Sequence, residues 1–287
     1  MNTFTGEDPS VRRERYVVEL SARLAADPRI RAAWLEGSLG RGNADRFSDV
    51  DLHVLLHEQD FSTFQAQAEE WLNEVRPLVL FNRLFGGHMI NVLTHDAIRL
   101  DLWPHRGESV TLDPATVRVL HATPGSLARE SPVAVPDGAA LARQGLAQTR
   151  EFWRCLTLLP AVIGRDERLV ALNGLMVEVN LVCDLLMLGT GTVRDRGVKN
   201  LNPFLSPENR QHLEDLVTLG DLSPQTLIQA HLALAGLVQV QGRQSARQAG
   251  EPYPQALEDT ALNYVRSELT ALGYSVPGLE SQGRKES

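Results

Sequence analysis

Cysteine, lysine and long charge-free hydrophobic runs are scarce in this 287-residue chain. The two cysteines, Cys155 and Cys183, lie in apolar helical patterns, so we expect buried free thiols in a reducing cytoplasm rather than a disulfide framework. The N-terminus lacks the basic start and apolar segment of a secretory signal. The most apolar stretch, residues 169–188, contains Glu178 and Asp184, which argues against a membrane span. These absences predict a cytoplasmic protein with no membrane partner.

Clustered positive charge is also missing. The net charge is −8, the isoelectric point is near 5.5, and the arginines are scattered along the chain. Binding to duplex DNA or to RNA needs a basic face that neutralises several phosphates. The composition therefore argues against a nucleic-acid partner and favours a small-molecule partner. The ordinary apolar share of 43% and the chain length allow two globular domains.

The most informative segment that is present spans residues 34–56. Gly37 and Ser38 close one apolar run, and Asp49 and Asp51 lie at the start of the next. Strand side chains alternate, so the two carboxylates share one face about 6–7 Å apart. Oxygen ligands of this kind suit Mg²⁺ together with substrate phosphates. A Gly-Ser turn that opens a short helix offers N–H groups to a phosphate, although a helix-capping role for Ser38 is the simpler alternative.

These residues resemble a known family. Gly37-Ser38, a gap of ten residues and then Asp49-Val50-Asp51-Leu52 are similar to the motif of the DNA polymerase β-like nucleotidyltransferase superfamily. The variant Gly-Ser-Leu-Gly-Arg-Gly followed by Ser-Asp-Val-Asp-Leu resembles the branch that adenylylates aminoglycoside and lincosamide antibiotics. Glu36 departs from the pattern, because the wider family usually has an apolar residue before the glycine.

A third acid fits the same resemblance. In residues 97–103, the apolar side chains Ile98, Leu100 and Leu102 face one way and Asp101 faces the other. The resemblance implies a third carboxylate in such a strand, as a metal ligand or as the general base for the acceptor hydroxyl. The alternative is an exposed strand residue paired with a neighbouring arginine, Arg99 or Arg106. His53 shares the face of Asp51, and we interpret it as an imidazole packed against a neighbour.

The resemblance implies an α/β (α+β) fold, with a small mixed β-sheet nucleotidyltransferase domain followed by an α-helical bundle domain. We expect the first domain over residues 1–122, a linker or long loop over 123–138, the helical domain over 139–275 and a disordered tail over 276–287. The active site should lie in the cleft between the domains. Polar residues Asn173, Asn180 and Asp184 form a narrow stripe on a predicted helix that faces the acceptor or is satisfied in the core.

The implied activity is Mg²⁺-dependent transfer of a nucleoside monophosphate, AMP from ATP, to a hydroxyl of a small molecule. The first acceptor candidates are aminoglycosides and lincosamides. Three alternatives stay open: adenylylation of a protein in a regulatory or toxin–antitoxin system, a non-catalytic nucleotide-binding module, and a polynucleotide enzyme, which steep salt-dependent RNA binding would indicate. Metal binding is assigned to Asp49, Asp51 and Asp101, and nucleotide binding to Gly37, Ser38, Arg41 and Lys199.

Hydrophobic periodicity predicts the individual elements. A helix opens at Asp8-Pro9, and another starts at Ser62 with Gln65 completing a capping box. Strands are predicted over 30–35, 50–56, 78–84, 88–93 and 97–103. Helices of the second domain are predicted over 140–163, 167–188, 207–219, 224–248 and 255–272.

Overall fold

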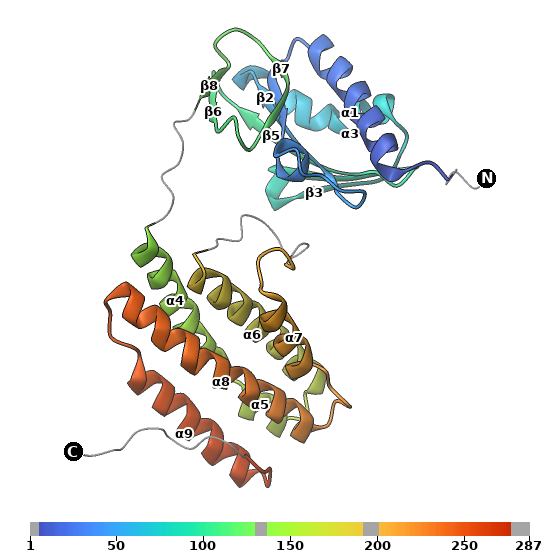
Figure 1. Cartoon of the computed structure of the whole chain (residues 1–287). Coiled ribbons are helices and arrows are strands. Elements are labelled where there is room, and N and C mark those ends of the chain that lie inside the picture. The colour runs from blue at the N-terminus through green and yellow to red at the C-terminus, as the bar shows by residue number, and fades with distance from the viewer. Residues whose placement is uncertain (1–5, 130–136, 192–200, 277–287) are drawn as a thin grey trace. The chain divides into compact units, whose positions relative to one another are not determined.

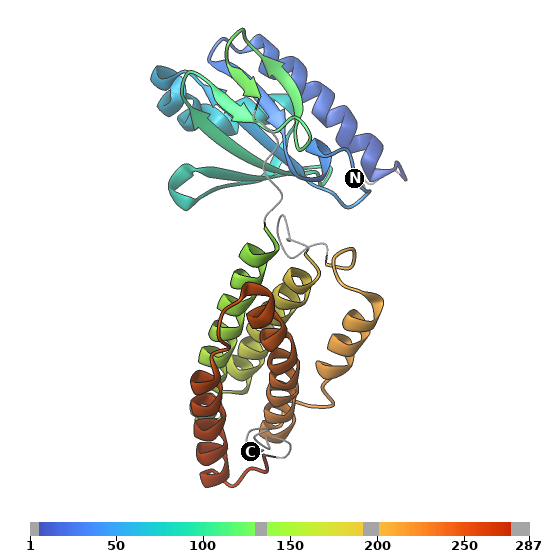
Figure 2. The same cartoon turned by 60° about the vertical axis from the view of Figure 1, so that its left-hand side comes forward.

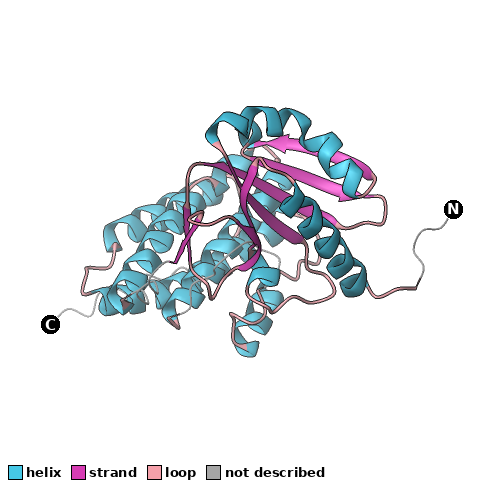
Figure 3. Cartoon of the chain, turned by 90° about the horizontal axis from the view of Figure 1, so that it is seen from above, coloured by secondary structure: helices cyan, strands magenta, loops and turns pink. Residues whose placement is uncertain are grey.

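The structure is a computed structural model that describes residues 6–129, 137–191 and 201–276. The chain divides into two compact units, residues 1–134 and 135–287 (Figure 1). All the strands of the described residues lie in the first unit, whereas the described part of the second unit is helical (Figure 3). The predicted α/β fold with a following helical region is therefore confirmed.

The first unit is built on a six-stranded sheet with the order β3-β4-β5-β2-β1-β7. Its strands in chain order are β1 (Ile30–Leu35), β2 (Val50–Leu56), β3 (Leu78–Leu84), β4 (Met89–Thr94), β5 (Arg99–Arg106) and β7 (Arg118–Ala122). β2 and β5 run parallel, and all the other neighbours are antiparallel, so the sheet is mixed. The parallel pair lies at the centre of the sheet, so β2 and β5 each have a strand on both sides.

Two helices cover one face of this sheet. They are α1 (Pro9–Ala26) and α3 (Phe61–Val75), whose apolar stripes pack on alternate residues of the central strands to form the main core. The Asp8 side chain accepts a hydrogen bond from the N–H of Ser10 and Pro9 occupies the first turn, so α1 starts as predicted. A one-turn helix, α2 (Gly37–Gly40), follows β1, and short 3₁₀ turns lie at Glu58–Asp60 and Phe85–Gly87.

Within the described residues of the first unit, two short strands cover one end of the opposite face. Two three-residue strands, β6 (Val110–Leu112) and β8 (Leu127–Arg129), pair in parallel. They pack on a small cluster made of Ala32, Trp34 and Leu55. Further along the same face, Asp51, Asp101 and Trp103 remain partly exposed. Asp51 and Asp101 lie on the part of this face that is beyond β6 and β8.

The second unit is a helical bundle (Figure 2). Its helices are α4 (Gly138–Leu156), α5 (Leu159–Gly164), α6 (Arg168–Gly189), α7 (Pro207–Leu216), α8 (Pro224–Ala249) and α9 (Gln255–Ala271). α4, α6 and α8 pack on one another in all three combinations, and α9 packs on α4 and α5. α4 and α8 approach closely at two glycines: a Cβ on Gly145 would lie 2.6 Å from Ser245 Oγ, and one on Gly242 would lie 2.7 Å from Thr149 Cγ2.

α6 is the most apolar helix of the bundle. By length and composition it is, among the described residues, the one helix that could cross a membrane, a property that core helices of soluble proteins share. It packs on both α4 and α8, and a buried polar pair joins it to α8: Nδ1 of His231 in α8 lies 2.7 Å from Oε2 of Glu178 in α6. His231 Nε2 lies 3.1 Å from the carbonyl of Ala171. Burial raises the pKa of the Glu178 carboxyl, and the imidazole of His231 opposes this shift.

Several predicted elements need correction. Residues 123–138, expected as a linker or long loop, contain β8, and β6 and β7 were not predicted. The helix predicted over 140–163 is two helices, α4 and α5. α3 begins at Phe61 after Asp60, and Gln65 donates to the carbonyl of Gly87 instead of closing a capping box. Asn173 and Asn180 are exposed, so neither is satisfied in the core as one reading required.

Candidate active site

Two of the predicted acids are direct neighbours in the sheet. In the parallel ladder of β2 and β5, Asp51 is the register partner of Asp101, so both side chains project from the same face of the sheet. Each is partly buried. Asp49 precedes β2 by one residue and is also partly buried. The strand pairing thus brings together two carboxylates that are fifty residues apart in sequence.

Gly37 makes room for the Asp51 carboxylate. A Cβ built on Gly37 would lie only 2.0 Å from Asp51 Oδ2, and the glycine has a φ of +62°. The backbone N–H of Glu36 donates to the Asp51 carbonyl over 2.9 Å, which joins the start of α2 to β2. Glu36 occupies the N-cap position of α2, so Ser38 lies inside the turn and is not its cap. Gly37 therefore lies directly against the Asp51 carboxylate, and Ser38 follows it in the same turn.

Asn91 extends the line of polar side chains. Its amide Nδ2 donates to Asp101 Oδ1, and the register pairs Asn91 with Asp101 on one side and with Asn82 on the other. Asn82, Asn91, Asp101 and Asp51 consequently form one transverse line across four strands, here called the acid–amide row. The amide fixes the orientation of the Asp101 carboxylate.

A second transverse line lies next to the acid–amide row on the same face. Trp103 is the register partner of His53, which is the partner of Trp34, and Met89 takes the next place on β4 because Ile90 pairs with Leu102. Trp103, His53 and Trp34 form the aromatic row, and Met89 continues the same line on β4. The His53 ring stacks between Trp34 and Trp103, with centroid separations of 5.4 Å and 5.9 Å. His53 is thus a packed imidazole, as interpreted from the sequence.

Two further polar groups touch this row. His53 Nδ1 lies 2.9 Å from Nε2 of His105, and burial lowers the pKa of His105 despite the opposing charge of Glu36. The Glu36 carboxylate accepts a hydrogen bond of 3.1 Å from Trp34 Nε1, and its other oxygen lies 3.7 Å from His53 Nε2. Glu36, the residue that departs from the family pattern, therefore has a role in holding the aromatic row.

The loop that carries Asp49 is anchored from outside. Arg13 of α1 is 4% exposed, and its Nη1 donates to the carbonyls of Asp45 at 2.8 Å and Ser48 at 3.0 Å. Arg99 donates to the carbonyl of Phe47. These bonds tie the backbone directly before Asp49 to α1 and β5. Arg99 thus serves the loop, and Arg106, the other proposed partner of Asp101, pairs with Glu58.

The sequence missed three contributors to this face. Asn91, Trp103 and the carboxylate of Glu36 were not selected as functional residues. The alternation in β4 carries a usable signal, because Asn91 lies between Ile90 and Val92 as Asp101 lies between Leu100 and Leu102. The register that aligns the strands is a tertiary property, so adjacency of Asn91 and Asp101 could not be obtained from local pattern.

The other two residues predicted to bind the nucleotide are Arg41 and Lys199. Arg41 follows α2 directly and is partly exposed. Lys199 lies outside the described residues. The assignments of Gly37, Ser38, Arg41 and Lys199 to the nucleotide stay predictions.

The donor set of the site fits a hard divalent cation. Asp51 and Asp101 are adjacent oxygen donors on one face, and the missing Cβ of Gly37 leaves space at the Asp51 carboxylate. Within the described ranges, no three histidine, cysteine, aspartate or glutamate side chains are gathered into a ready-made metal group. Metal binding by Asp49, Asp51 and Asp101 together therefore remains a prediction.

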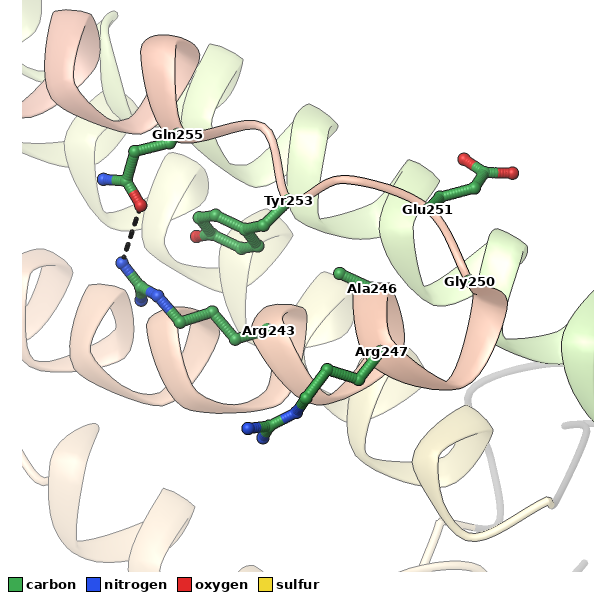
Figure 4. Close-up of a pocket in the computed structure, with 7 residues that line it drawn as sticks. All are labelled: Arg243, Ala246, Arg247, Gly250, Glu251, Tyr253 and Gln255. Atoms are coloured by element: carbon green, nitrogen blue, oxygen red, sulfur yellow. Dashed lines mark hydrogen bonds between the residues drawn. The ribbon is translucent and has the colours of Figure 1, made fainter.

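The helical unit has a shallow hollow of about 380 Å³ at the end of α8 (Figure 4). Arg243 projects into it, where its guanidinium lies 4.5 Å from the Tyr253 ring centroid and bonds to Gln255 and the buried Glu258. These partners give Arg243 a structural role. None of the predicted site residues lines this hollow.

Comparisons with known proteins bear on the first unit most directly. Residues 18–114 match the family model described as a nucleotidyltransferase domain. This segment contains Gly37, Ser38 and all three predicted acids. No curated protein matches the sequence significantly.

Three solved structures illustrate the range of similar folds. An aminoglycoside 6-adenyltransferase from Bacillus subtilis is 14% identical, with 90% of this chain and 97% of that chain covered and a TM-score of 0.42. A nucleotidyltransferase-like protein from Exiguobacterium sibiricum is 12% identical, with coverages of 90% and 89% and a TM-score of 0.35. The cyclic dinucleotide synthase CdnE of Elizabethkingia meningoseptica, solved with GTP and Apcpp, is 15% identical, with coverages of 93% and 93% and a TM-score of 0.27.

The substrates in those descriptions belong to those proteins. The family match covers the segment that holds the Gly-Ser turn and the paired acids, and the domain it describes is that of an enzyme. The resemblance to nucleotidyltransferases found in the sequence is therefore confirmed: residues 18–114, in the N-terminal unit of this chain, form a nucleotidyltransferase domain.

Proposed function

We propose that this protein is a Mg²⁺-dependent adenylyltransferase that transfers AMP from ATP to a hydroxyl group of a small molecule. The observation that carries the proposal is the in-register pairing of Asp51 and Asp101, with Gly37 directly against the Asp51 carboxylate. This arrangement sets a phosphate-compatible turn beside two oxygen donors. Aminoglycosides and lincosamides are the first acceptors to test, and a net charge of −8 suits a cationic acceptor.

In the proposed reaction, the acceptor oxygen forms a bond to the α-phosphorus of ATP as the bond from that phosphorus to the bridging oxygen breaks. Pyrophosphate leaves with the bonding electron pair, and the hydroxyl proton passes to a base. A Mg²⁺ ion held by Asp49, Asp51 and Asp101 would neutralise charge on the phosphates. Gly37, Ser38, Arg41 and Lys199 are the groups that we assign to the triphosphate.

Asp101 has two candidate roles with different consequences. As a base, its carboxylate accepts the hydroxyl proton, and Asn91 holds the carboxylate in the orientation for that transfer. As a metal ligand, it instead completes the oxygen set with Asp51. The pH dependence of kcat separates the roles, because a base must lose its proton before turnover whereas a bound cation keeps the ligand ionised.

The test is mass spectrometry of a small-molecule panel incubated with the protein, four nucleoside triphosphates and Mg²⁺. We expect at least one hydroxylated compound to gain a nucleoside monophosphate, and we expect Asp49→Asn and Asp51→Asn to abolish that product. Identical behaviour of the wild type and both variants on every acceptor would show that these acids are not catalytic. Labelled nucleotide on protein, with none on small molecules, would favour the protein-adenylylation alternative.

A further inference from the structure

We propose that Arg13 is a positioning residue for the metal site, because it holds the turn of residues 45–48 directly before Asp49. In the position that this turn gives it, Asp49 joins Asp51 and Asp101 as a ligand of the divalent cation. The inference rests on the proposed function, since it concerns the cation of the same reaction. The residues that carry it all belong to the first unit.

Asp49 differs from the other two acids in the way its backbone is held. Asp51 and Asp101 are register partners in the ladder of β2 and β5, so strand pairing fixes the positions of both residues. Asp49 comes one residue before β2, and the register of that ladder begins at Val50. The position of the Asp49 carboxylate therefore depends on the turn that leads into the strand.

The turn of residues 45–48 is closed by its own hydrogen bonds. Asp45 Oδ1 accepts from the N–H of Phe47 at 2.9 Å and from the hydroxyl of Ser48 at 3.0 Å. These two bonds lower the pKa of the Asp45 carboxyl, and the positive charge of Arg13 adds to the effect. The N–H of Ser48 also donates to the Asp45 carbonyl, at 3.3 Å. The turn is thus ordered internally, but these bonds do not attach it to the rest of the unit.

Arg13 of α1 supplies an attachment at both ends of the turn. Its Nη1 donates to the carbonyl of Asp45 at 2.8 Å and to the carbonyl of Ser48 at 3.0 Å. The second of these carbonyls belongs to the peptide group that joins Ser48 to Asp49. Because each Nη nitrogen of an arginine carries two hydrogens, one atom can bind both carbonyls. The guanidinium therefore fixes the orientation of the turn as well as its position, and with it the backbone of Asp49.

The surroundings of Arg13 point to a role beyond packing. The residue is only 4% exposed, and its Nε is buried without a hydrogen-bond partner in the described part of the chain. The partners of its Nη1 are neutral carbonyls. Burying a charge costs free energy that hydrogen bonds to neutral groups offset only in part. What the arrangement provides is a fixed backbone before a proposed metal ligand, and the groups that orient such ligands strongly affect metal affinity.

The test measures the binding of Mn²⁺ to the full-length protein by electron paramagnetic resonance, because Mn²⁺ accepts the same carboxylate ligands as Mg²⁺. Arg13→Met keeps an unbranched side chain and removes the donors. We expect it to weaken Mn²⁺ binding about tenfold, as the loss of a group that orients a metal ligand does. Arg13→Lys should weaken binding less, since a shorter ammonium side chain still donates to a carbonyl. Asp49→Asn should weaken binding at least as much as Arg13→Met.

Arg29→Met is the matched control. Arg29 is a partly buried arginine of the same unit that bonds to Asp27 and Gln67, and it precedes β1 at the end opposite Gly37. Chemical denaturation of each variant separates stability from metal affinity. An Arg13 that served the fold alone would behave as Arg29 should, with a loss of stability and an unchanged affinity for Mn²⁺.

Wild-type affinity for Mn²⁺ in Arg13→Met, or an equal loss of affinity in Arg29→Met, would overturn the inference, and so would absence of Mn²⁺ binding by the wild type. If Arg13→Met does not fold, Arg13→Lys decides, and wild-type affinity in that variant contradicts the inference. Failure of the proposed function is a separate result, since it appears as no transfer to any acceptor by the wild type. Weakened Mn²⁺ binding in Arg13→Met together with no transfer would support the role of Arg13 without the proposed function.

Discussion

At the scale of single residues, the site depends on the absence of a side chain at Gly37. Any side chain at this position meets Asp51 Oδ2, because a Cβ would lie 2.0 Å away, and the backbone φ of +62° disfavours other residues independently. The backbone before Gly37 and strand β2 cannot easily move apart, because the N–H of Glu36 donates a hydrogen bond to the carbonyl of Asp51. Glycine is therefore needed at position 37 for two reasons: it leaves space for the Asp51 carboxylate, and it adopts the positive φ of the turn.

We predict that Gly37→Ala lowers kcat about 10²-fold or more, because a displacement of about 1 Å of a reacting group can cost that much. The matched control is Gly42→Ala: Gly42 also has a positive φ, +71°, but nothing lies within 4 Å of its Cβ position. Both variants carry the backbone strain of about 1–3 kcal/mol, and only Gly37→Ala displaces Asp51. Equal activity losses in the two variants would mean that strain, rather than the Asp51 contact, is responsible.

The same residues explain what the sequence could provide about the site. Gly37, Asp49 and Asp51 lie within one short segment, so their proximity follows from local spacing and alternation. Asp101 could be proposed because an acid in an apolar strand is unusual. The alternation in β4 marked Asn91 as a polar residue in an apolar strand, but the adjacency of Asn91 and Trp103 to the acids comes only from the strand register.

At the scale of elements, periodicity predicted long segments well and short ones poorly. β1, β2 and β3 have the predicted bounds, because each is a clear apolar run between turn residues. β6 and β8 have three residues each, and their pairing rather than their pattern makes them strands. The break between α4 and α5 comes just before Pro160, which lies in the first turn of α5. Proline in a helix interior removes a hydrogen bond, so Pro160 was a local signal against the predicted single helix.

Close packing of α4 and α8 yields an element-scale prediction. Gly145 of α4 faces Ser245 of α8, and Gly242 of α8 faces Thr149 of α4, so each helix has a glycine at the contact. We expect Gly242→Ala to destabilise the bundle by about 1–3 kcal/mol, because the added methyl would lie 2.7 Å from Thr149 Cγ2 and force the helices apart. Chemical denaturation followed by circular dichroism measures the change.

Gly236 supplies the control on the same helix. It lies in α8, and nothing is within 4 Å of its Cβ position. Gly236→Ala should stabilise the protein by about 0.5–1 kcal/mol, because alanine loses less backbone entropy in a helix. Opposite signs for the two variants are the expected result. Stabilisation by both would mean that α4 and α8 tolerate the methyl group and that the close approach is not limiting.

At the scale of the whole molecule, the chain has two separate cores. One joins the sheet to α1 and α3, and the other is formed by residues that follow position 151. The sequence indicated this division through the change from alternating to helical periodicity. The three acids proposed to bind metal belong to the first unit, whereas the buried Glu178–His231 pair belongs to the core of the second.

That pair makes the stability of the helical unit depend on pH. Burial, partly opposed by the hydrogen bond and charge of His231, raises the native pKa of Glu178 above the value of an unfolded chain. The folded state consequently binds this proton more tightly than the unfolded state does. The stabilisation from Glu178 is complete below the usual carboxyl pKa and is lost as the pH rises through the raised native value.

We therefore predict that Glu178→Gln flattens the fall in the free energy of unfolding as the pH rises through that range. The amide has nearly the same shape and can still accept a hydrogen bond from His231, but it does not titrate. Glu214→Gln, which replaces an acid that is 60% exposed on α7, is the matched control and should keep the wild-type slope. Denaturation followed by the helical circular dichroism signal at several pH values gives the slopes. A wild-type slope in Glu178→Gln would mean that another group sets the pH dependence, and the buried pair would then be structural packing without a role in proton linkage.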